Sequence, residues 1–175
     1  KKKKDTFAVE SNKKTTAAHE KGHFKNEIVP IKGVDYDDGA RADSSVETLA
    51  KLRTAFKSVD DGGTVTAGNA SQVTDGASAV MVTSESFAAA NNLPVKAIIL
   101  GYGEASLAPE IMGLGPVDAS KEALKRAGLT MADIDIVELN EAFAAQSIAV
   151  MKEFEKQGHK IDPAKVNLDG GAIAM

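Results

Sequence analysis

The sequence predicts an α/β protein whose sheet is mostly parallel and covered by helices. Three short runs rich in β-branched residues have the length of buried strands, and they span residues 77–82, 95–100 and 134–139. Segments in which apolar residues recur at helical spacing separate and follow these runs. Strands that alternate with helices in this way are typical of a parallel sheet with helices on its faces.

Composition and charge exclude several classes of protein. The 175 residues suffice for one domain with a sizeable core, and the net charge of -4 argues against a general nucleic-acid binder. No apolar run is long enough to span a bilayer, and no hydrophobic stretch follows Lys1–Lys4, so we expect neither a membrane span nor a signal peptide. We interpret these lysines as a solvated helix start rather than a nucleic-acid or membrane patch, because no aromatic residues are interleaved with them. No organelle-targeting segment is visible, so we expect an intracellular, cytoplasmic protein.

The first elements in chain order are a surface helix, a short extended run and a loop. Apolar residues set among Lys and Glu predict a helix over residues 6–21 that ends near Gly22. Pro30 places the extended run 27–31 at a sheet edge. Residues 33–45 are rich in Asp, Gly and Ser, which predicts a loop.

A second helix is predicted to begin at Ser44 or Ser45 and to reach Phe56. Ser44-Ser45-Val46-Glu47 resembles a capping box, in which the first side chain accepts from the helix backbone and the last reaches back to the cap. The pair Gly62-Gly63 then interrupts the chain.

After Gly62-Gly63 each predicted strand is followed by a segment with helical spacing. Pro116 fits the first turn of the predicted helix over residues 116–127, and Gly128 fits its end. The predicted helices cover residues 84–90, 116–127 and 142–155.

A metal-binding pattern occurs near the end of the first helix. His19-Glu20-Lys21-Gly22-His23 matches the HExxH pattern of zinc hydrolases, in which both imidazoles lie on one helix face. Gly22 weakens the helix that would have to present them, and His159 is the one remaining histidine for a third ligand. We therefore predict no metal site.

A glycine motif follows the second predicted strand. Gly101-Tyr102-Gly103 partly matches a dinucleotide-binding fingerprint, but its third glycine is missing and no long helix follows before Pro109. We interpret the motif as a strand that ends in a glycine-permitted turn.

Residues 64–71 are mostly small and would expose backbone amides to a ligand. Asn69 and Ser71 add short polar groups to this stretch. The alternative is a tight irregular loop in which Asn and Gly adopt positive φ. The local chemistry leaves both interpretations open.

Residues 138–146 place polar side chains between a predicted strand and a helix. In open α/β sheets ligands bind at the carboxyl ends of strands, and a helix amino terminus favours negative charge. The Asn140 amide could fix a water or an oxyanion there, or it could simply cap the helix.

These last two segments together resemble the thiolase family. Residues 137–146 carry the family's Asn-Glu-Ala-Phe motif as Asn140-Glu141-Ala142-Phe143, and residues 63–71 resemble its Thr-Ala-Gly-Asn-(Ala/Ser)-Ser stretch. Other matching segments keep the family's order, and they are residues 49–56, 109–116 and 166–174. The similarity covers nearly the whole chain from Asp5 onward.

The resemblance implies a coenzyme A-dependent acyltransferase. Thiolases cleave a 3-ketoacyl-CoA by thiolysis or catalyse the reverse Claisen condensation, with a cysteine thiolate as the nucleophile. Coenzyme A is then a substrate, and no permanently bound cofactor is implied. The implied partners are acyl-CoA, coenzyme A and further copies of the chain in a homodimer or homotetramer.

The resemblance also implies roles for individual residues. Asn140 matches the family asparagine that positions a water in the oxyanion hole for the thioester enolate. The residues that would bind coenzyme A are Ala142 and Phe143 in the pantetheine tunnel, Ala67 and Ser71 on the pantetheine arm, Thr48 and Phe56 beside it, and Arg41 near the phosphates of the nucleotide end.

The implied architecture is part of the thiolase fold, which has α-β-α-β-α layers. Residues 1–62 would form the loop domain that covers coenzyme A, residues 63–93 the last part of the N-terminal half, and residues 94–175 the first part of the C-terminal half. The family's nucleophilic cysteine lies before the position of Asp5, and its catalytic histidine follows that of Met175. Because the sequence has no cysteine, the alternative function is a coenzyme A-binding fragment or assembly piece without activity of its own.

Overall fold

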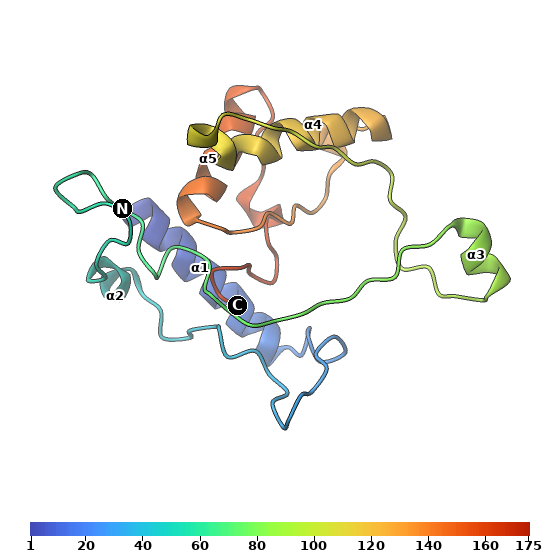
Figure 1. Cartoon of the computed structure of the whole chain (residues 1–175), viewed down its shortest axis with the longest axis horizontal. Coiled ribbons are helices and arrows are strands. Elements are labelled where there is room, and N and C mark those ends of the chain that lie inside the picture. Colours follow the sequence, from blue (N-terminus) through green and yellow to red (C-terminus); the bar gives the residue numbers. More distant parts are fainter.

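A computed structural model describes all 175 residues, and its regular elements are helices (Figure 1). Helix α5 contacts both α1 and α4, whereas α3 lies at the far end of two long, open stretches of chain (Figure 1). The α-helices are α1 (Lys2–Glu20), α2 (Val46–Ala50), α3 (Glu85–Ala90), α4 (Gly115–Ala127) and α5 (Ala144–Lys156). Three 3-10 helices are η1 (Pro109–Leu114), η2 (Met131–Asp133) and η3 (Pro163–Lys165).

The longer helices follow the local signals of the sequence. Helix α1 gives way to Gly22, whose φ of 74° suits glycine, and α4 ends at Gly128, whose φ is 68°. Helix α3 is capped by Ser84, whose side chain accepts from the backbone N–H of Phe87. No helix is both long enough and apolar enough to cross a bilayer.

Helix α2 is shorter than predicted, and its capping box is shifted by one residue. Ser45, rather than Ser44, accepts from the backbone of Thr48, whose hydroxyl in turn bonds to the Ser45 N–H. The prediction that the helix reaches Phe56 is wrong, because the chain pairs with another segment after Lys51. The backbone N–H of Ala55 donates to the carbonyl of Val65 at 2.9 Å, which draws this stretch out of helical geometry.

Two of the predicted strands form no ladder. Residues 72–83 and 94–107 make no backbone–backbone hydrogen bond, so the predicted strands 77–82 and 95–100 are open stretches of chain without a paired neighbour. The apolar side chains of both stretches are exposed, including Val80, Met81, Ile98 and Ile99. A strand is stabilised by its neighbours in a sheet, and these 175 residues supply no neighbour to either stretch.

The third predicted strand, residues 134–139, is partly formed. Val137 makes a parallel bridge with Val166: its N–H donates to the carbonyl of Lys165 at 2.9 Å, and its own carbonyl accepts from Asn167 at 2.9 Å. This bridge lies directly before residues 138–143, which lead to the start of α5. It therefore fixes one end of this segment.

Two apolar clusters hold the structure together. The first joins α1 and α2 to the start of α5 and the C-terminal residues, and it consists of Ala8, Val9, Leu49, Ala144 and Ile173. The second lies between α4, α5 and the Val137–Val166 bridge, and it consists of Val117, Val150, Phe154, Ile161 and Val166. Burial of such side chains stabilises each cluster by about 1.5–3 kcal/mol per large residue.

The glycines of Gly101-Tyr102-Gly103 serve close packing rather than a turn. A Cβ on Gly101 would lie 2.5 Å from the carbonyl oxygen of Ala123, and one on Gly103 would clash with the carbonyl of Ala119. Both carbonyls belong to α4, so the missing side chains let an open stretch of chain lie directly against this helix. The Arg126 guanidinium also covers the Tyr102 ring, 4.3 Å from its centroid.

Candidate functional site

The two motif segments pair with each other through their backbones. The backbone N–H of Ser71 donates to the carbonyl of Ala142 at 3.0 Å, and the N–H of Ala144 donates to the carbonyl of Asn69 at 3.0 Å. Ala70 and Phe143 form the antiparallel bridge between these two bonds. We call residues 69–71 and 142–144 the motif pair, because this short pairing fixes one motif against the other.

An aromatic contact lies beside the motif pair. The rings of Phe56 and Phe143 meet edge to face, with centroids 6.0 Å apart and an interplanar angle of 74°. Phe56 is 75% exposed, and Ala67 and Ser71 are also exposed. The structure therefore gathers four of the residues expected to bind coenzyme A, namely Phe56, Ser71, Ala142 and Phe143, at one accessible place.

Asn69 is a structural residue of the loop 64–71. Its side chain is buried, its Oδ1 accepts from the N–H of Thr66 at 3.0 Å, and its Nδ2 donates to Asp5 Oδ1 at 2.8 Å and to the carbonyl of Thr64 at 3.2 Å. Neither Asn69 nor Gly68 has a positive φ, so the alternative of a loop in which Asn and Gly adopt positive φ is wrong for these two residues. The loop is instead held by these hydrogen bonds, which anchor it to α1.

Asn140 does not cap helix α5. The N-cap position is Phe143, which makes no side-chain cap bond, so the helix-cap interpretation of Asn140 is wrong. Asn140 is exposed, and its side-chain amide makes no hydrogen bond within the protein. An unpaired amide next to the motif pair is available to a ligand or a water.

Thr48 lies on α2, and Arg41 is hydrogen-bonded through its backbone to α1. The Thr48 hydroxyl is used in the α2 capping box, and the backbone N–H of Arg41 donates to Asn12 Oδ1 at 2.8 Å. Gly68 has no room for a Cβ beside Leu49, so α2 packs closely on this loop. Arg41 is exposed, its guanidinium pairs with no carboxylate, and no hydrogen bond or ion pair joins it to the motif pair.

The HExxH pattern does not form a helical pair of ligands. Helix α1 ends at Glu20, so His23 lies beyond it, where its Nδ1 is 2.9 Å from Asp169 Oδ1. The His19 ring packs against Phe24, with centroids 4.8 Å apart. No group of three or more His, Cys, Asp or Glu residues has the arrangement of a metal site.

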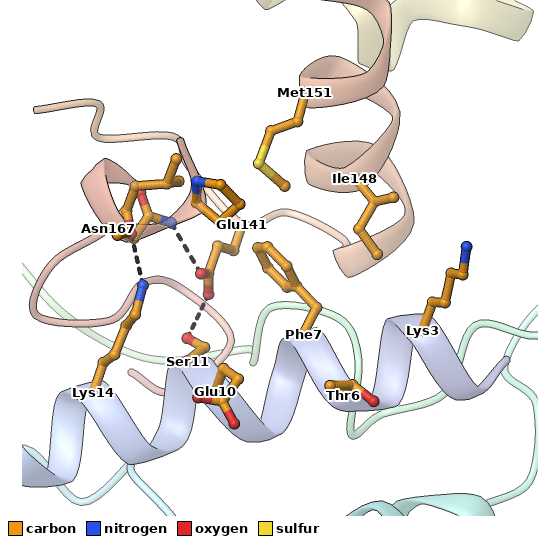
Figure 2. A pocket seen from close by; sticks show the side chains of 13 residues that line it. Lys3, Thr6, Phe7, Glu10, Ser11, Lys14, Glu141, Ile148, Met151 and Asn167 are labelled. Atoms are coloured by element: carbon orange, nitrogen blue, oxygen red, sulfur yellow. Dashed lines mark hydrogen bonds between the residues drawn. The ribbon is translucent and has the colours of Figure 1, made fainter. Parts of the chain in front are cut away.

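A buried polar network around Glu141, the residue that follows Asn140, is a feature that sequence reasoning missed (Figure 2). Glu141 is 1% exposed, and its carboxylate accepts from the Ser11 hydroxyl at 2.6 Å, from Asn167 Nδ2 at 2.9 Å and from the backbone N–H of Ile173 at 3.2 Å. We call Ser11, Glu141 and Asn167 the polar network. A carboxylate directly after Asn140 was the one local signal in the sequence, because the contacts with Ser11 and Asn167 join distant parts of the chain.

The polar network forms the floor of a cavity of about 500 Å³ between α1 and α5 (Figure 2). Phe7, Ile148 and Met151 contribute apolar walls, and Lys3 lies at its edge. None of the site residues expected from the sequence lines this cavity. Both oxygens of Glu141 already accept hydrogen bonds, so the carboxylate serves as a cross-link rather than as a free base.

The two carboxylates whose pKa values are shifted lie outside the site. Hydrogen bonds from the Thr130 hydroxyl and backbone lower the pKa of Asp133, and hydrogen bonds from Gln157 and Lys156 lower that of Glu153. Asp133 is exposed and Glu153 is half-buried, and both carboxylates take part in local capping or pairing near helix ends.

Comparisons with known proteins agree with this geometry. Residues 1–86 match the thiolase N-terminal domain, and residues 93–175 match the thiolase C-terminal domain. A probable acetyl-CoA acyltransferase of Staphylococcus aureus is 48% identical over 180 residues, and an acetyl-CoA acetyltransferase of Pseudomonas aeruginosa is 47% identical. Each alignment covers 98% of this chain and 44% of the relative, so the chain spans less than half the length of these relatives.

Solved structures give the same result. Human mitochondrial 3-ketoacyl-CoA thiolase in complex with CoA superimposes with a TM-score of 0.91 at 43% identity, over 99% of this chain and 43% of that protein. The acetyl-CoA acetyltransferase of Bacillus anthracis superimposes with a TM-score of 0.88 at 38% identity, over 99% of this chain and 44% of that protein. The open stretches of this chain therefore follow the thiolase path although they form no ladder here. The chain belongs to the thiolase family, and its structure is part of the thiolase fold.

Proposed function

We propose that this chain carries the coenzyme A and oxyanion side of a thiolase active site. The reaction would be thiolytic cleavage of a 3-ketoacyl-CoA, or the reverse Claisen condensation of acyl-CoA units. The observation that carries this proposal is the motif pair, in which the Ser71 N–H bonds to the carbonyl of Ala142 at 3.0 Å and so joins the two motifs next to the free amide of Asn140.

In the cleavage direction a cysteine thiolate attacks the 3-keto carbonyl carbon. The bond between C2 and C3 then breaks, and its electron pair passes to the thioester enolate of the departing acetyl-CoA, which takes a proton at C2. The acyl group remains on the cysteine sulfur until the thiolate of a second coenzyme A accepts it. The role of Asn140 is to hold a water against the thioester oxygen, where negative charge develops.

The exposed residues around Asn140 suit the pantetheine arm. Phe143 and Phe56 offer an apolar face, and Ser71 and Ala67 leave room for a narrow chain to approach the backbone. Ala142 lies between Asn140 and Phe143, and Thr48 lies on α2, which packs on the loop 64–71. The unpaired Arg41 guanidinium is suited to the phosphates of the nucleotide end.

The alternative is a coenzyme A-binding or assembly piece without catalysis of its own, and the absence of cysteine from these 175 residues favours it. The intact mass of the native protein separates the two functions. A native polypeptide of 18.3 kDa could not supply the thiolate, whereas a larger one could.

The thiolysis of acetoacetyl-CoA tests the catalytic proposal in a protein that contains this sequence and a cysteine nucleophile. Asn140→Ala is expected to lower kcat by roughly 10²–10³-fold, because one oxyanion donor is lost. An unchanged kcat would contradict the role of Asn140. Absence of thiolysis by the wild-type protein would contradict the proposed reaction.

The resemblance also supports two further proposals. We propose a homodimer or homotetramer, which sedimentation velocity would test directly. We propose the division into a loop domain over residues 1–62, the end of the N-terminal half over residues 63–93 and the start of the C-terminal half over residues 94–175.

A further inference from the structure

We propose that Asn167 and Glu141 are positioning residues that fix Asn140 from both sides. The side chain of Asn167 spans residue 140: its Oδ1 accepts from the N–H of Leu139 at 2.7 Å, and its Nδ2 donates to the carbonyl of Leu139 at 2.8 Å and to Glu141 Oε1 at 2.9 Å. One amide therefore holds the residue before Asn140 and the residue after it. The proposal rests on the proposed function, because that function is what gives the position of Asn140 a chemical role.

The carboxylate of Glu141 ties this arrangement to two other parts of the chain. Its Oε2 accepts from the Ser11 hydroxyl on α1 and from the backbone N–H of Ile173. The Ser11 oxygen in turn accepts from the N–H of Gly171 at 3.2 Å. Ser11, Glu141 and Asn167 are each at most 3% exposed, so their hydrogen bonds are largely shielded from bulk water.

The backbone around the network has an unusual conformation at one residue and leaves no space at another. Asn167 has a φ of 47°, a left-handed conformation that asparagine tolerates better than most residues. A Cβ on Gly171 would lie 2.5 Å from Glu141 Cδ, so the chain approaches the carboxylate more closely than any side chain allows. Residues in unusual backbone conformations around a buried charge commonly mark a functional site.

The polar network and Asn140 differ in how many hydrogen-bond partners their side chains have within the protein. Every polar atom of the Asn167 and Glu141 side chains has a partner, whereas the Asn140 amide is exposed and has none. A buried carboxylate stabilises a fold poorly compared with apolar residues of similar size, but it can specify one conformation. Here the conformation specified is that of the backbone that carries Asn140.

Glu141→Gln tests the proposal, with Glu138→Gln as the matched control. Glutamine keeps the shape of Glu141 but replaces one of its acceptor oxygens with a donor, so either the Asn167 bond or the Ile173 bond is lost. Glu138 is exposed and makes no hydrogen bond, so its substitution changes the same charge without touching the network. Ser11→Ala is a milder second variant that removes one donor and leaves the carboxylate paired with Asn167.

The readout is the ¹⁵N order parameter of the Asn140 backbone amide in the 175-residue chain without ligand. We expect about 0.85 in the wild type and in Glu138→Gln, and less than about 0.6 in Glu141→Gln, with Ser11→Ala also lowered. A role in stability alone would lower Tm but leave Asn140 rigid in the folded protein. Folded Glu141→Gln or Ser11→Ala with a rigid Asn140 would overturn the proposal, and Ser11→Ala decides it if Glu141→Gln does not fold.

A second readout separates this proposal from the proposed function. The side-chain amide signal of Asn140 is expected to shift when coenzyme A is added to the wild type, and to shift less than half as far in Glu141→Gln. No shift in the wild type would contradict the proposed function, while the order parameters would still test the positioning role. An equal shift in both proteins would contradict the positioning role alone.

Discussion

The backbone N–H of Ser71 donates to the carbonyl oxygen of Ala142 at 3.0 Å. This bond joins a loop that follows the Gly62-Gly63 pair to the turn that precedes α5. It therefore places the exposed Ser71 beside the residues that follow Asn140. The predictions below test what this arrangement binds and what holds it in place.

Phe56→Ala is expected to weaken coenzyme A binding by about 2- to 13-fold, because the exposed ring beside Phe143 would lose one contact with the ligand, and such an aromatic contact contributes about 0.5–1.5 kcal/mol. Isothermal titration calorimetry measures this change. Phe87→Ala is the matched control, since Phe87 is also exposed but lies on α3, away from the motif pair. Equal affinities for the two variants would exclude the ring of Phe56 from the binding surface.

Gly171→Ala is expected to lower the free energy of unfolding by about 1–3 kcal/mol, because the new Cβ would overlap the Glu141 side chain. Urea denaturation followed by circular dichroism gives the value. Gly76→Ala is the control, since its Cβ would meet no atom within 4 Å and its φ is not positive. If the Gly171→Ala protein were as stable as Gly76→Ala, the Glu141 side chain could make room for the new Cβ without loss of stability, which would contradict the prediction.

Hydrogen exchange tests the two open stretches. Residues 72–83 and 94–107 make no backbone–backbone hydrogen bond, so we expect their amides to exchange at nearly the rate of an unfolded peptide. The amides of α4 and α5 serve as the internal reference for protection. Protection of residues 77–82 and 95–100 in the 175-residue chain would mean that these stretches pair with another polypeptide, such as a second copy.

Some of these features could be predicted from the sequence because their causes are local. The end of α1 at Gly22 and the end of α4 at Gly128 both follow from a glycine that adopts positive φ. The cap of α3 by Ser84 follows from the preference of serine for that position. Each signal needs only a few neighbouring residues.

Other features depend on distant parts of the chain and could not be predicted. Ser11 and Glu141 are 130 positions apart, so no local pattern indicates that they share a hydrogen bond. The ladders expected over residues 77–82 and 95–100 depend on neighbouring strands, which a propensity pattern does not supply. The early end of α2 has the same kind of cause, because Ala55 pairs with Val65.

The pKa of Asp133 offers a test of electrostatics away from the site. The Thr130 hydroxyl donates to its carboxylate at 2.7 Å and the Thr130 N–H at 2.8 Å, and both bonds lower the pKa. Because the pKa is lower in the folded state, the stabilisation is present above the unfolded-state pKa and is lost as the pH falls through the folded-state value. Thr130→Val should raise the pKa of Asp133 in an NMR titration, whereas Thr83→Val should not; equal titration curves would contradict the assignment.

The most direct test of the central claim is a coenzyme A titration followed by amide chemical shifts over the whole 175-residue chain. If the motif pair and Asn140 bind coenzyme A, saturable shifts are expected at Ser71, Asn140, Ala142 and Phe143. Shifts confined to the cavity between α1 and α5, at Thr6, Glu10 and Ile148, or no saturable shift anywhere, would contradict the central claim.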